Sequence, residues 1–161
     1  MARVAILTLS DAGAAGRRED RSGDRAAERL AADGHQVVAR DLLPDERETI
    51  AGRLREWCDA GIADLLLTTG GTGLTARDVT PEATRDIAER DVPGIVTALH
   101  LEGLKKTPYA ILSRGLAVTR GSTLIVNLPG NPKAIDEGMD VLLPILPHIA
   151  ELLAGPVEHE G

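Results

Sequence analysis

Two threonines and three glycines follow an apolar run in the middle of the chain, and these residue types in this order can bind an anion. Leu65–Thr69 is short, apolar and bounded by glycine, which predicts a buried strand. The loop over residues 70–73 has glycine at three of its four positions, so its backbone can turn with positive φ and present N–H groups to a ligand. The stretch therefore predicts an anion-binding loop.

A carboxylate and a helix start follow this loop. Asp78 stands just before Thr80, a common N-cap residue, and Pro81, which suits the first helical position. A helix is therefore predicted from about residue 81 to 89. Strand, glycine loop, acid and helix N-terminus in this order indicate a site for an anionic ligand with a metal. A local Asx-type turn is the alternative role of Asp78, and both stay open here.

Predicted strands and helices alternate along the rest of the chain. The further predicted strands are Val4–Leu9, Gln36–Leu43, Ala110–Leu112, Leu116–Thr119 and Thr123–Leu128. The further predicted helices are Asp24–Ala32, a helix opened by Pro44 and Asp45, Pro93–Leu104, and a helix from Pro132 that breaks near Pro144 and resumes to Leu153. Residues 12–23 are predicted as a surface loop, and the tail from Gly155 as frayed.

This alternation predicts an α/β fold, with helices on both faces of a mostly parallel central sheet, in a three-layer α/β/α arrangement. No repeat or linker is present, so residues 1–161 are expected to form one domain. Ligands of such folds bind at the carboxyl ends of the strands. Polar or glycine-rich segments follow the predicted strands and should meet at this edge: Ser10-Asp11, Asp45, Thr69–Gly73, Ser113-Arg114 and Asn127–Asn131.

Two of the charged candidates also have ordinary structural roles. Asp45 can form a capping box with Glu48, although one carboxylate oxygen can cap while the other faces a ligand. Lys133 falls in the first turn of a helix capped by Asn131, where the helix dipole disfavours a cation. An anion beside Lys133 would explain this placement, and a solvated surface lysine is the alternative.

Composition excludes several classes of function. A net charge of −7, with no Phe, one Trp and one Tyr, argues against nucleic-acid binding. The most apolar stretch, residues 141–153, is interrupted by two prolines, so no membrane span is predicted and the protein is expected to be cytoplasmic. Cys58 is the only cysteine and is expected in the core, and the four histidines have no ligand spacing. The glycines of Gly71-x-Gly73 open no helix, which excludes the dinucleotide fingerprint.

Taken together, the ordered motifs resemble the molybdenum cofactor biosynthesis family, and the resemblance extends from Val4 to about Leu153. The motifs that carry it are Thr68–Gly73, Asp78–Ala83, Ser113-Arg114 and Leu128–Ala134. The resemblance implies adenylyl transfer from ATP to molybdopterin, which gives adenylyl-molybdopterin and pyrophosphate in the presence of Mg²⁺. It also implies a homotrimer, with small-molecule substrates and other cofactor-assembly enzymes as partners.

The same resemblance assigns roles to residues of this chain. Asp45 and Asp78 match the catalytic acids of the family. Two carboxylates can bind Mg²⁺, which prefers oxygen ligands. Independently of the resemblance, Ser10, Asp11 and the loop over residues 13–23 are candidates for contacts with the nucleotide. The expected substrate-binding residues are Thr69, Gly70, Gly71, Thr72, Gly73, Thr80, Pro81, Ser113, Arg114, Asn127, Pro129, Gly130, Asn131 and Lys133.

Two other functions remain open at this point. A non-catalytic molybdopterin-binding or scaffold protein would have the same pocket, with Asp45 acting only as a helix cap. A relative of the similar domain in nicotinamide-nucleotide amidohydrolases would need a further hydrolase domain, for which 161 residues leave no room. The chain keeps both Asp45 and Asp78-Val79-Thr80-Pro81, which favours the catalytic branch of the family.

Overall fold

The computed structural model describes residues 1–155, and its centre is a six-stranded sheet in the order β2-β1-β3-β6-β5-β4. The strands are β1 (Arg3–Leu9), β2 (Gln36–Leu43), β3 (Leu65–Thr69), β4 (Arg90–Asp91), β5 (Ala117–Arg120) and β6 (Thr123–Leu128). The pairs that join β2, β1, β3 and β6 are parallel, while β5 runs antiparallel to both β6 and β4. The prediction of a mostly parallel sheet is confirmed.

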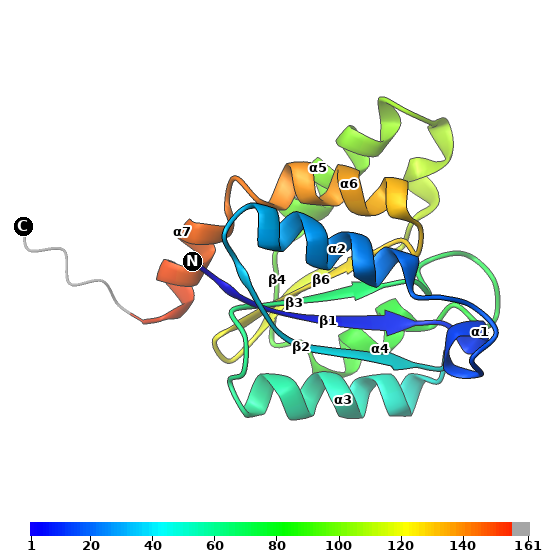
Figure 1. Ribbon diagram of the computed structural model, residues 1–161, viewed down its shortest axis with the longest axis horizontal. Coiled ribbons are helices and arrows are strands. Elements are labelled where there is room, and N and C mark those ends of the chain that lie inside the picture. Colours follow the sequence, from blue (N-terminus) through cyan, green and yellow to red (C-terminus); the bar gives the residue numbers. More distant parts are fainter. Residues whose placement is uncertain (156–161) are drawn as a thin grey trace, which may run out of the picture.

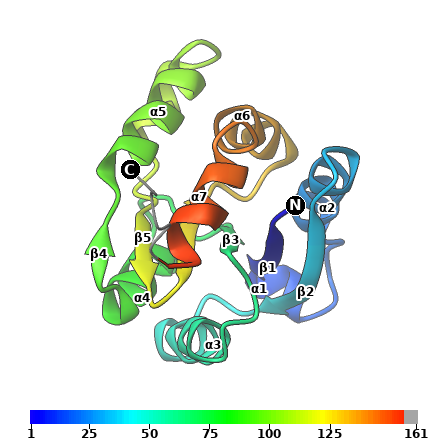
Figure 2. The ribbon, with the colours of Figure 1, turned by 90° about the vertical axis from the view of Figure 1, so that its left-hand side faces the viewer.

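Helices cover both faces of this sheet (Figures 1 and 2). The helices are α1 (Asp11–Ala14), α2 (Arg21–Ala32), α3 (Arg47–Asp59), α4 (Thr80–Ile87), α5 (Pro93–Leu104), α6 (Pro132–Leu142) and α7 (Leu146–Leu153), with the 3₁₀ helix η1 at Pro108–Leu112. In Figure 1, α2 and α6 lie above the sheet and α3 lies below it. The three-layer α/β/α architecture is therefore confirmed.

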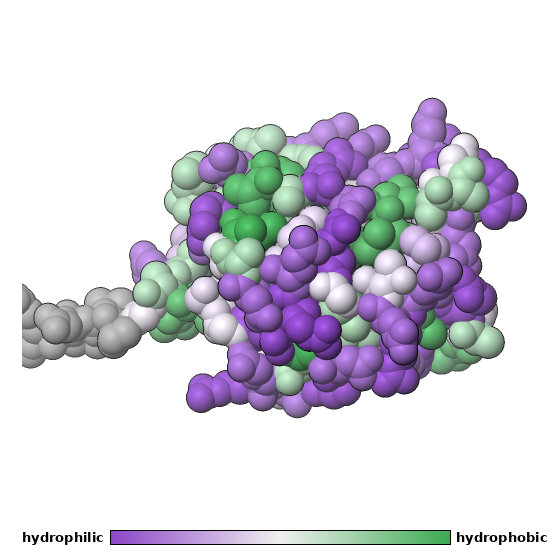
Figure 3. All heavy atoms as spheres, turned by 90° about the horizontal axis from the view of Figure 1, so that it is seen from below, coloured by the Kyte–Doolittle hydropathy of each residue, from purple (hydrophilic) through white to green (hydrophobic). Residues whose placement is uncertain are grey.

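Alternation along the strands divides the core into two clusters. Ile6 and Leu67 point into one cluster, which α2, α5, α6 and α7 cover with residues such as Leu30. Leu7 and Leu66 point into the other, which α3 and α4 cover. The outer side of the α3 and α4 layer is largely hydrophilic (Figure 3), as expected of helices that bury one stripe only. Because helices cover both faces of the sheet, every residue of β3 is buried, including the two threonines at its end.

The structure differs from the predicted elements at two places. Residues 12–23 contain α1 and the start of α2 rather than only a loop, because Ser10 and Asp20 accept hydrogen bonds from Gly13 N–H and Gly23 N–H as N-caps. The predicted strand Ala110–Leu112 is wrong. Pro108 and the Thr107 hydroxyl, which accepts from Tyr109 N–H, favour the 3₁₀ turn of η1 instead.

Other predicted elements are confirmed closely. β2, β6 and α5 have the predicted bounds, and α6 begins at Pro132, with the Asn131 side chain accepting from Ala134 N–H. The short edge strand β4 is an addition to the prediction. The predicted frayed tail lies, beyond Gly155, outside the described residues. No helix among residues 1–155 has the length and apolar character needed to cross a membrane.

Candidate active site

The glycine loop lies between the carboxyl ends of β1, β3 and β6. Gly70 and Gly71 have φ values of +95° and +70°, which L side chains rarely adopt. Gly70 N–H donates to Leu128 O at 2.9 Å, and a Cβ on Gly70 would lie 2.4 Å from Leu9 O. Gly130, which follows β6, also lies very close to Gly70, because a Cβ on Gly130 would lie 2.9 Å from Gly70 Cα. Only glycine fits this junction of β1, β3 and β6.

Thr80 connects the glycine loop to α4. Its N–H donates to Gly71 O at 3.1 Å and its hydroxyl donates to Gly70 O at 2.9 Å. The N-cap of α4 is Val79, so the prediction of Thr80 as the N-cap is wrong. Thr80 and Pro81 are both buried. They therefore shape the loop from beneath and present no side chain to solvent in this structure.

The carboxylates of Asp45 and Asp11 each accept a hydrogen bond from the backbone N–H of the other residue. Asp11 N–H donates to Asp45 Oδ2 at 3.1 Å, and Asp45 N–H donates to Asp11 Oδ1 at 3.0 Å. The capping-box prediction for Asp45 is wrong, because Glu46 is the N-cap of α3 and no side chain caps that helix. Within the described residues, Asp45 Oδ1 is buried and has no hydrogen-bond partner. This oxygen is free to serve a ligand.

Asp78 lies beside Gly73 of the loop. Its Oδ2 accepts hydrogen bonds from Thr75 N–H at 3.0 Å and from the Thr75 hydroxyl at 2.8 Å. These bonds reach back along the chain, so the alternative of an Asx turn, which reaches forward, is not what forms. A Cβ on Gly73 would lie 2.8 Å from Asp78 Oδ2, and one on Gly71 would lie 3.1 Å from Asp45 Oδ1. The two acids therefore both border the glycine loop.

Electrostatics at this pair favour a bound cation. Burial raises the pKa of Asp45, and the negative charges of Asp11 and Asp78 raise it further, against the lowering effect of the Asp11 N–H bond. The pKa of Asp11 is lowered, chiefly by its hydrogen bonds from Arg77. A divalent cation would relieve the crowding of like charges and give Asp45 Oδ1 a partner. The residues present therefore fit an oxygen-liganded metal such as Mg²⁺.

We expect Asp45→Asn to increase the free energy of unfolding at pH 7 in metal-free buffer. The raised pKa means that folding disfavours the carboxylate, so this ionisation destabilises the wild type above that pKa. As the pH falls through the raised pKa and then below the ordinary value of 3.8, the advantage of the variant should vanish. Urea unfolding between pH 3 and pH 8 measures this. An advantage that grows as the pH falls would contradict the assignment.

Two cavities adjoin the glycine loop, and one of them is also lined by the two acids. The first, of about 960 Å³, is bordered by Asp45, Asp78 and the glycine loop, and on its far side by the segment from α1 to the start of α2. This segment, which the sequence offers as a candidate for the nucleotide, contributes Arg17, Arg18 and Arg21. No motif singles out these three arginines. We call this cavity the polar pocket.

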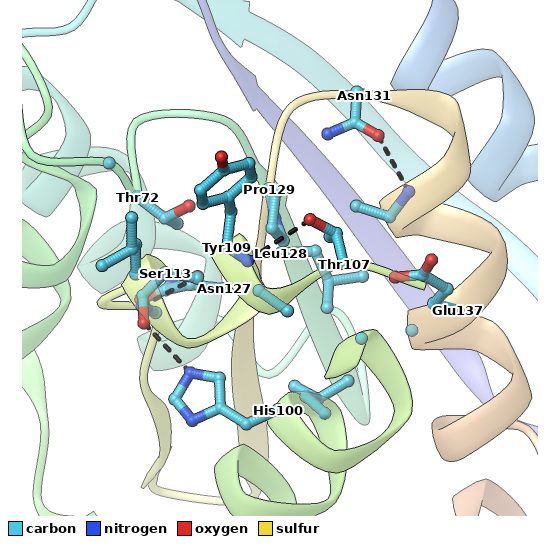
Figure 4. Close-up of a pocket in the computed structure, with 18 of the residues that line it drawn as sticks. Thr72, His100, Thr107, Tyr109, Ser113, Asn127, Leu128, Pro129, Asn131 and Glu137 are labelled. Carbon is cyan, nitrogen blue, oxygen red and sulfur yellow. Dashed lines mark hydrogen bonds between the residues drawn. The ribbon is translucent and has the colours of Figure 1, made fainter. Parts of the chain in front are cut away.

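The second cavity, of about 610 Å³, lies between α5, η1 and the start of α6 (Figure 4). We call it the α5–α6 pocket. Its lining includes Ser113, Lys133 and Tyr109. Thr72, Gly73 and Pro129 border both pockets, so the glycine loop is the wall that the two pockets share.

His100 is a pocket residue that the sequence did not reveal. Its Nε2–H donates to Ser113 O at 3.0 Å, as Figure 4 shows, and this bond fixes the ring at the pocket floor. No spacing in the sequence links these two residues, because α5 and the segment after η1 meet only in the folded chain. The scattered positions of the four histidines in the sequence predict no chemistry for His100.

The structure brings most of the predicted site residues to these pockets. The polar pocket is lined by Ser10, Asp45, Thr69, Gly70, Gly71, Asp78 and Gly130 in addition to the shared residues. The α5–α6 pocket is lined by Ser113, Asn127, Asn131 and Lys133 in addition to them. Asp11, Thr80, Pro81 and Arg114 line neither pocket.

Asn127 and Arg114 use their side chains within the protein. The Asn127 amide donates to the hydroxyls of Thr68 and Thr84, at 2.9 and 3.0 Å, and accepts from Leu116 N–H at 3.0 Å. Arg114 Nε, Nη1 and Nη2 each donate to a protein oxygen. Both residues therefore support the walls of the site in this structure.

A parallel α/β sheet whose carboxyl edge holds a glycine loop, two acids and two adjoining pockets has the arrangement of a protein that binds small ligands at this edge. Residues 5–148 match the family model described as "Probable molybdopterin binding domain", and the chain belongs to this family.

Known proteins similar to this chain include enzymes of cofactor synthesis. The Molybdopterin adenylyltransferase of Helicobacter pylori strain J99 is 37% identical over 158 residues, covering 94% of this chain and 88% of that protein. The Molybdenum cofactor synthesis protein cinnamon of Drosophila melanogaster is 45% identical over 122 residues, which are 76% of this chain. The match covers only 20% of cinnamon's own length.

Solved structures resemble the fold along almost its full length. The crystal structure of the Molybdopterin biosynthesis enzyme MoaB of Thermus thermophilus has a TM-score of 0.90 and 50% identity. It covers 97% of this chain, and the match spans 98% of that chain. A molybdopterin biosynthesis protein from Mycobacterium abscessus has a TM-score of 0.89 and 36% identity, with 95% of this chain and 96% of that chain covered.

Proposed function

We propose that this protein transfers the adenylyl group of ATP to molybdopterin and releases pyrophosphate. One observation carries the proposal: Asp45 and Asp78 line the polar pocket beside the glycine loop, and Thr72 and Gly73 of this loop also line the α5–α6 pocket. A reaction between two bound ligands requires that their pockets adjoin in this way. The relatives named molybdopterin adenylyltransferase, which match most of the chain, support the same reaction.

ATP is assigned to the polar pocket. Its arginines and the open N–H groups of the glycine loop suit a triphosphate, and the two acids suit the metal that accompanies it. Ser10 lines this pocket, while Asp11 contributes from behind by holding Asp45. Mg²⁺, when held there by Asp45 and Asp78, would supply positive charge to the phosphates.

Molybdopterin is assigned to the α5–α6 pocket, with its terminal phosphate directed towards the shared wall. Lys133 lies at this pocket in the first turn of α6. A phosphate beside Lys133 would satisfy both its charge and the helix N-terminus. The polar side chains of Ser113 and Asn131 are available to orient the pterin.

The chemistry then needs alignment rather than a proton-transfer residue. An oxygen of the terminal phosphate of molybdopterin forms a bond to the α-phosphorus of ATP. The bridging bond between the α- and β-phosphates breaks, and its electron pair leaves with pyrophosphate. Because the attacking oxygen is already ionised, no general base is required. The protein contributes alignment and electrostatic stabilisation of the spreading charge.

A pyrophosphate-release assay tests the proposal. Purified protein with molybdopterin, ATP and Mg²⁺ should release pyrophosphate and yield a pterin that carries AMP. Omitting either molybdopterin or the metal should abolish the release. Binding of molybdopterin without any pyrophosphate release would contradict the proposal and favour the non-catalytic binding protein. The main structural reason for that alternative is weakened, since Asp45 does not cap α3. The homotrimer, the cytoplasmic location and other cofactor-assembly enzymes as partners stay predictions.

A further inference from the structure

The segment Gly73–Asp78, which carries one of the two acids, makes few contacts with the rest of the protein. Residues 74–77 are exposed, and Leu74 has 65% of its surface in solvent. Several of its hydrogen bonds are internal, from Thr75 to the Asp78 carboxylate and from Asp78 N–H to Thr75 O. With so little packing, the position of Asp78 depends on hydrogen bonds from outside the segment.

Arg114 supplies such bonds at both ends of the segment. Its Nε donates to Gly73 O and its Nη2 donates to Asp78 O, each at 2.8 Å. Its backbone N–H donates to Thr72 O at 2.9 Å. In the described part of the chain, the other bonds from outside the segment join Arg77 to Asp11. Arg114 therefore closes the segment into a loop of fixed width, with Asp78 at one end.

Glu82 holds the guanidinium of Arg114 in the required orientation. It lies in the first turn of α4, and its Oε1 accepts from Arg114 Nη1 at 2.5 Å. The planar guanidinium can direct three donors at fixed angles, towards Glu82 and the two carbonyls, which a lysine ammonium cannot do. Glu82 belongs to neither pocket lining. The ion pair therefore acts on the site through the loop.

We propose that Glu82 and Arg114 are positioning residues that hold Asp78 in place to bind the metal. The inference rests on the proposed function for its effect on turnover. It assigns Arg114 to the support of the loop rather than to a substrate phosphate, and it gives Glu82 a role that its position in the first turn of a helix does not by itself reveal. Residues that orient metal ligands commonly affect metal affinity or activity by 10–100-fold.

Arg114→Lys and Glu82→Gln test the proposal, because each keeps the size and polarity of the side chain. Lysine also keeps the positive charge but lacks the planar set of donors that the guanidinium directs at Glu82 and the two carbonyls. We expect both variants to bind Mn²⁺, used as a probe of the Mg²⁺ site, about 10-fold more weakly. Amide hydrogen exchange should become faster in residues 73–78 alone. The value of kcat should fall by about 10–100-fold, with partial recovery at high Mg²⁺ and an unchanged KM for molybdopterin.

Asp86→Asn is the matched control. Asp86 lies on the same helix and forms a comparable ion pair with Arg47, at 2.8 Å, but borders neither pocket. It should leave Mn²⁺ affinity, loop exchange and kcat unchanged. Circular dichroism establishes whether each variant is folded. If Arg114→Lys does not fold, Glu82→Gln alone still tests the proposal.

Two results would overturn the inference. The first is unchanged Mn²⁺ affinity and unchanged loop exchange in both variants. The second is an increase in KM for either substrate in Arg114→Lys without faster loop exchange, which would show that Arg114 binds that substrate. If the wild type releases no pyrophosphate, the proposed function fails, whereas the exchange rate of residues 73–78 still decides whether Glu82 and Arg114 hold this loop.

Discussion

Asp45→Asn and Asp78→Asn are each expected to lower kcat for pyrophosphate release by at least ~10²-fold, the scale of losing one contact that stabilises the transition state. The substitutions keep the size of the side chain and remove the charge that would hold Mg²⁺ beside the phosphates. In Asp45→Asn the new amide oxygen can still accept the hydrogen bond from Asp11 N–H, so the site should keep its shape. Steady-state kinetics at saturating ATP and Mg²⁺ measures the loss, and direct titration should show unchanged binding of molybdopterin.

Glu48→Gln is the control for this experiment. Glu48 is an exposed carboxylate in the first turn of α3, three residues after Asp45, and lines neither pocket. It should retain wild-type turnover. Urea unfolding of Asp45→Asn, for which we expect a stability above that of the wild type at pH 7, separates a loss of activity from unfolding. Wild-type turnover in both acid variants would remove Asp45 and Asp78 from the mechanism.

Gly70→Ala is expected to reduce the free energy of unfolding by at least ~3 kcal/mol, because two penalties combine. The φ of +95° is unfavourable for any L side chain, and the new methyl group would lie 2.4 Å from Leu9 O. That oxygen belongs to the last residue of β1 and cannot move without disturbing the sheet. Urea unfolding measures the change, and activity should be lost where the variant still folds.

Gly34→Ala separates the two penalties. Gly34 has a similar φ of +81°, but a Cβ there would meet no atom within 4 Å. We therefore expect only the backbone cost of about 1–2 kcal/mol. Equal losses of stability in the two variants would mean that the close approach of Gly70 to β1 is unimportant.

Local sequence patterns predict the structure correctly at positions where a single local cause determines it. The apolar run of β3 and the glycines after it predict both the strand and the positive-φ loop. Asn131 followed by Pro132 predicts the start of α6 to the residue, because the cap and the fixed φ of proline agree. The carboxyl edge of a parallel sheet then brings Asp45 and the glycine loop together, although they are distant in sequence.

Patterns failed where partners distant in sequence decide the outcome. Thr80 has the local signature of an N-cap, yet its hydroxyl bonds Gly70 O because the glycine loop folds back over α4. Asp45 has the spacing of a capping box, yet its carboxylate accepts a hydrogen bond from Asp11 N–H instead. Arg114 is a predicted substrate-binding residue, and no local pattern indicates the contacts that its side chain makes within the protein. Its bonds to Gly73, Asp78 and Glu82 exist only in the folded chain.

The most direct test of the proposed reaction follows the label of ATP through one turnover. Protein with bound molybdopterin and Mg²⁺ is mixed with ATP labelled at either the α- or the γ-phosphate. The proposed reaction predicts that the α label appears in the pterin and the γ label in pyrophosphate, at equal rates. The same transfer should be at least ~10²-fold slower in Asp78→Asn. Release of the γ label as inorganic phosphate, with no α label in the pterin, would contradict adenylyl transfer.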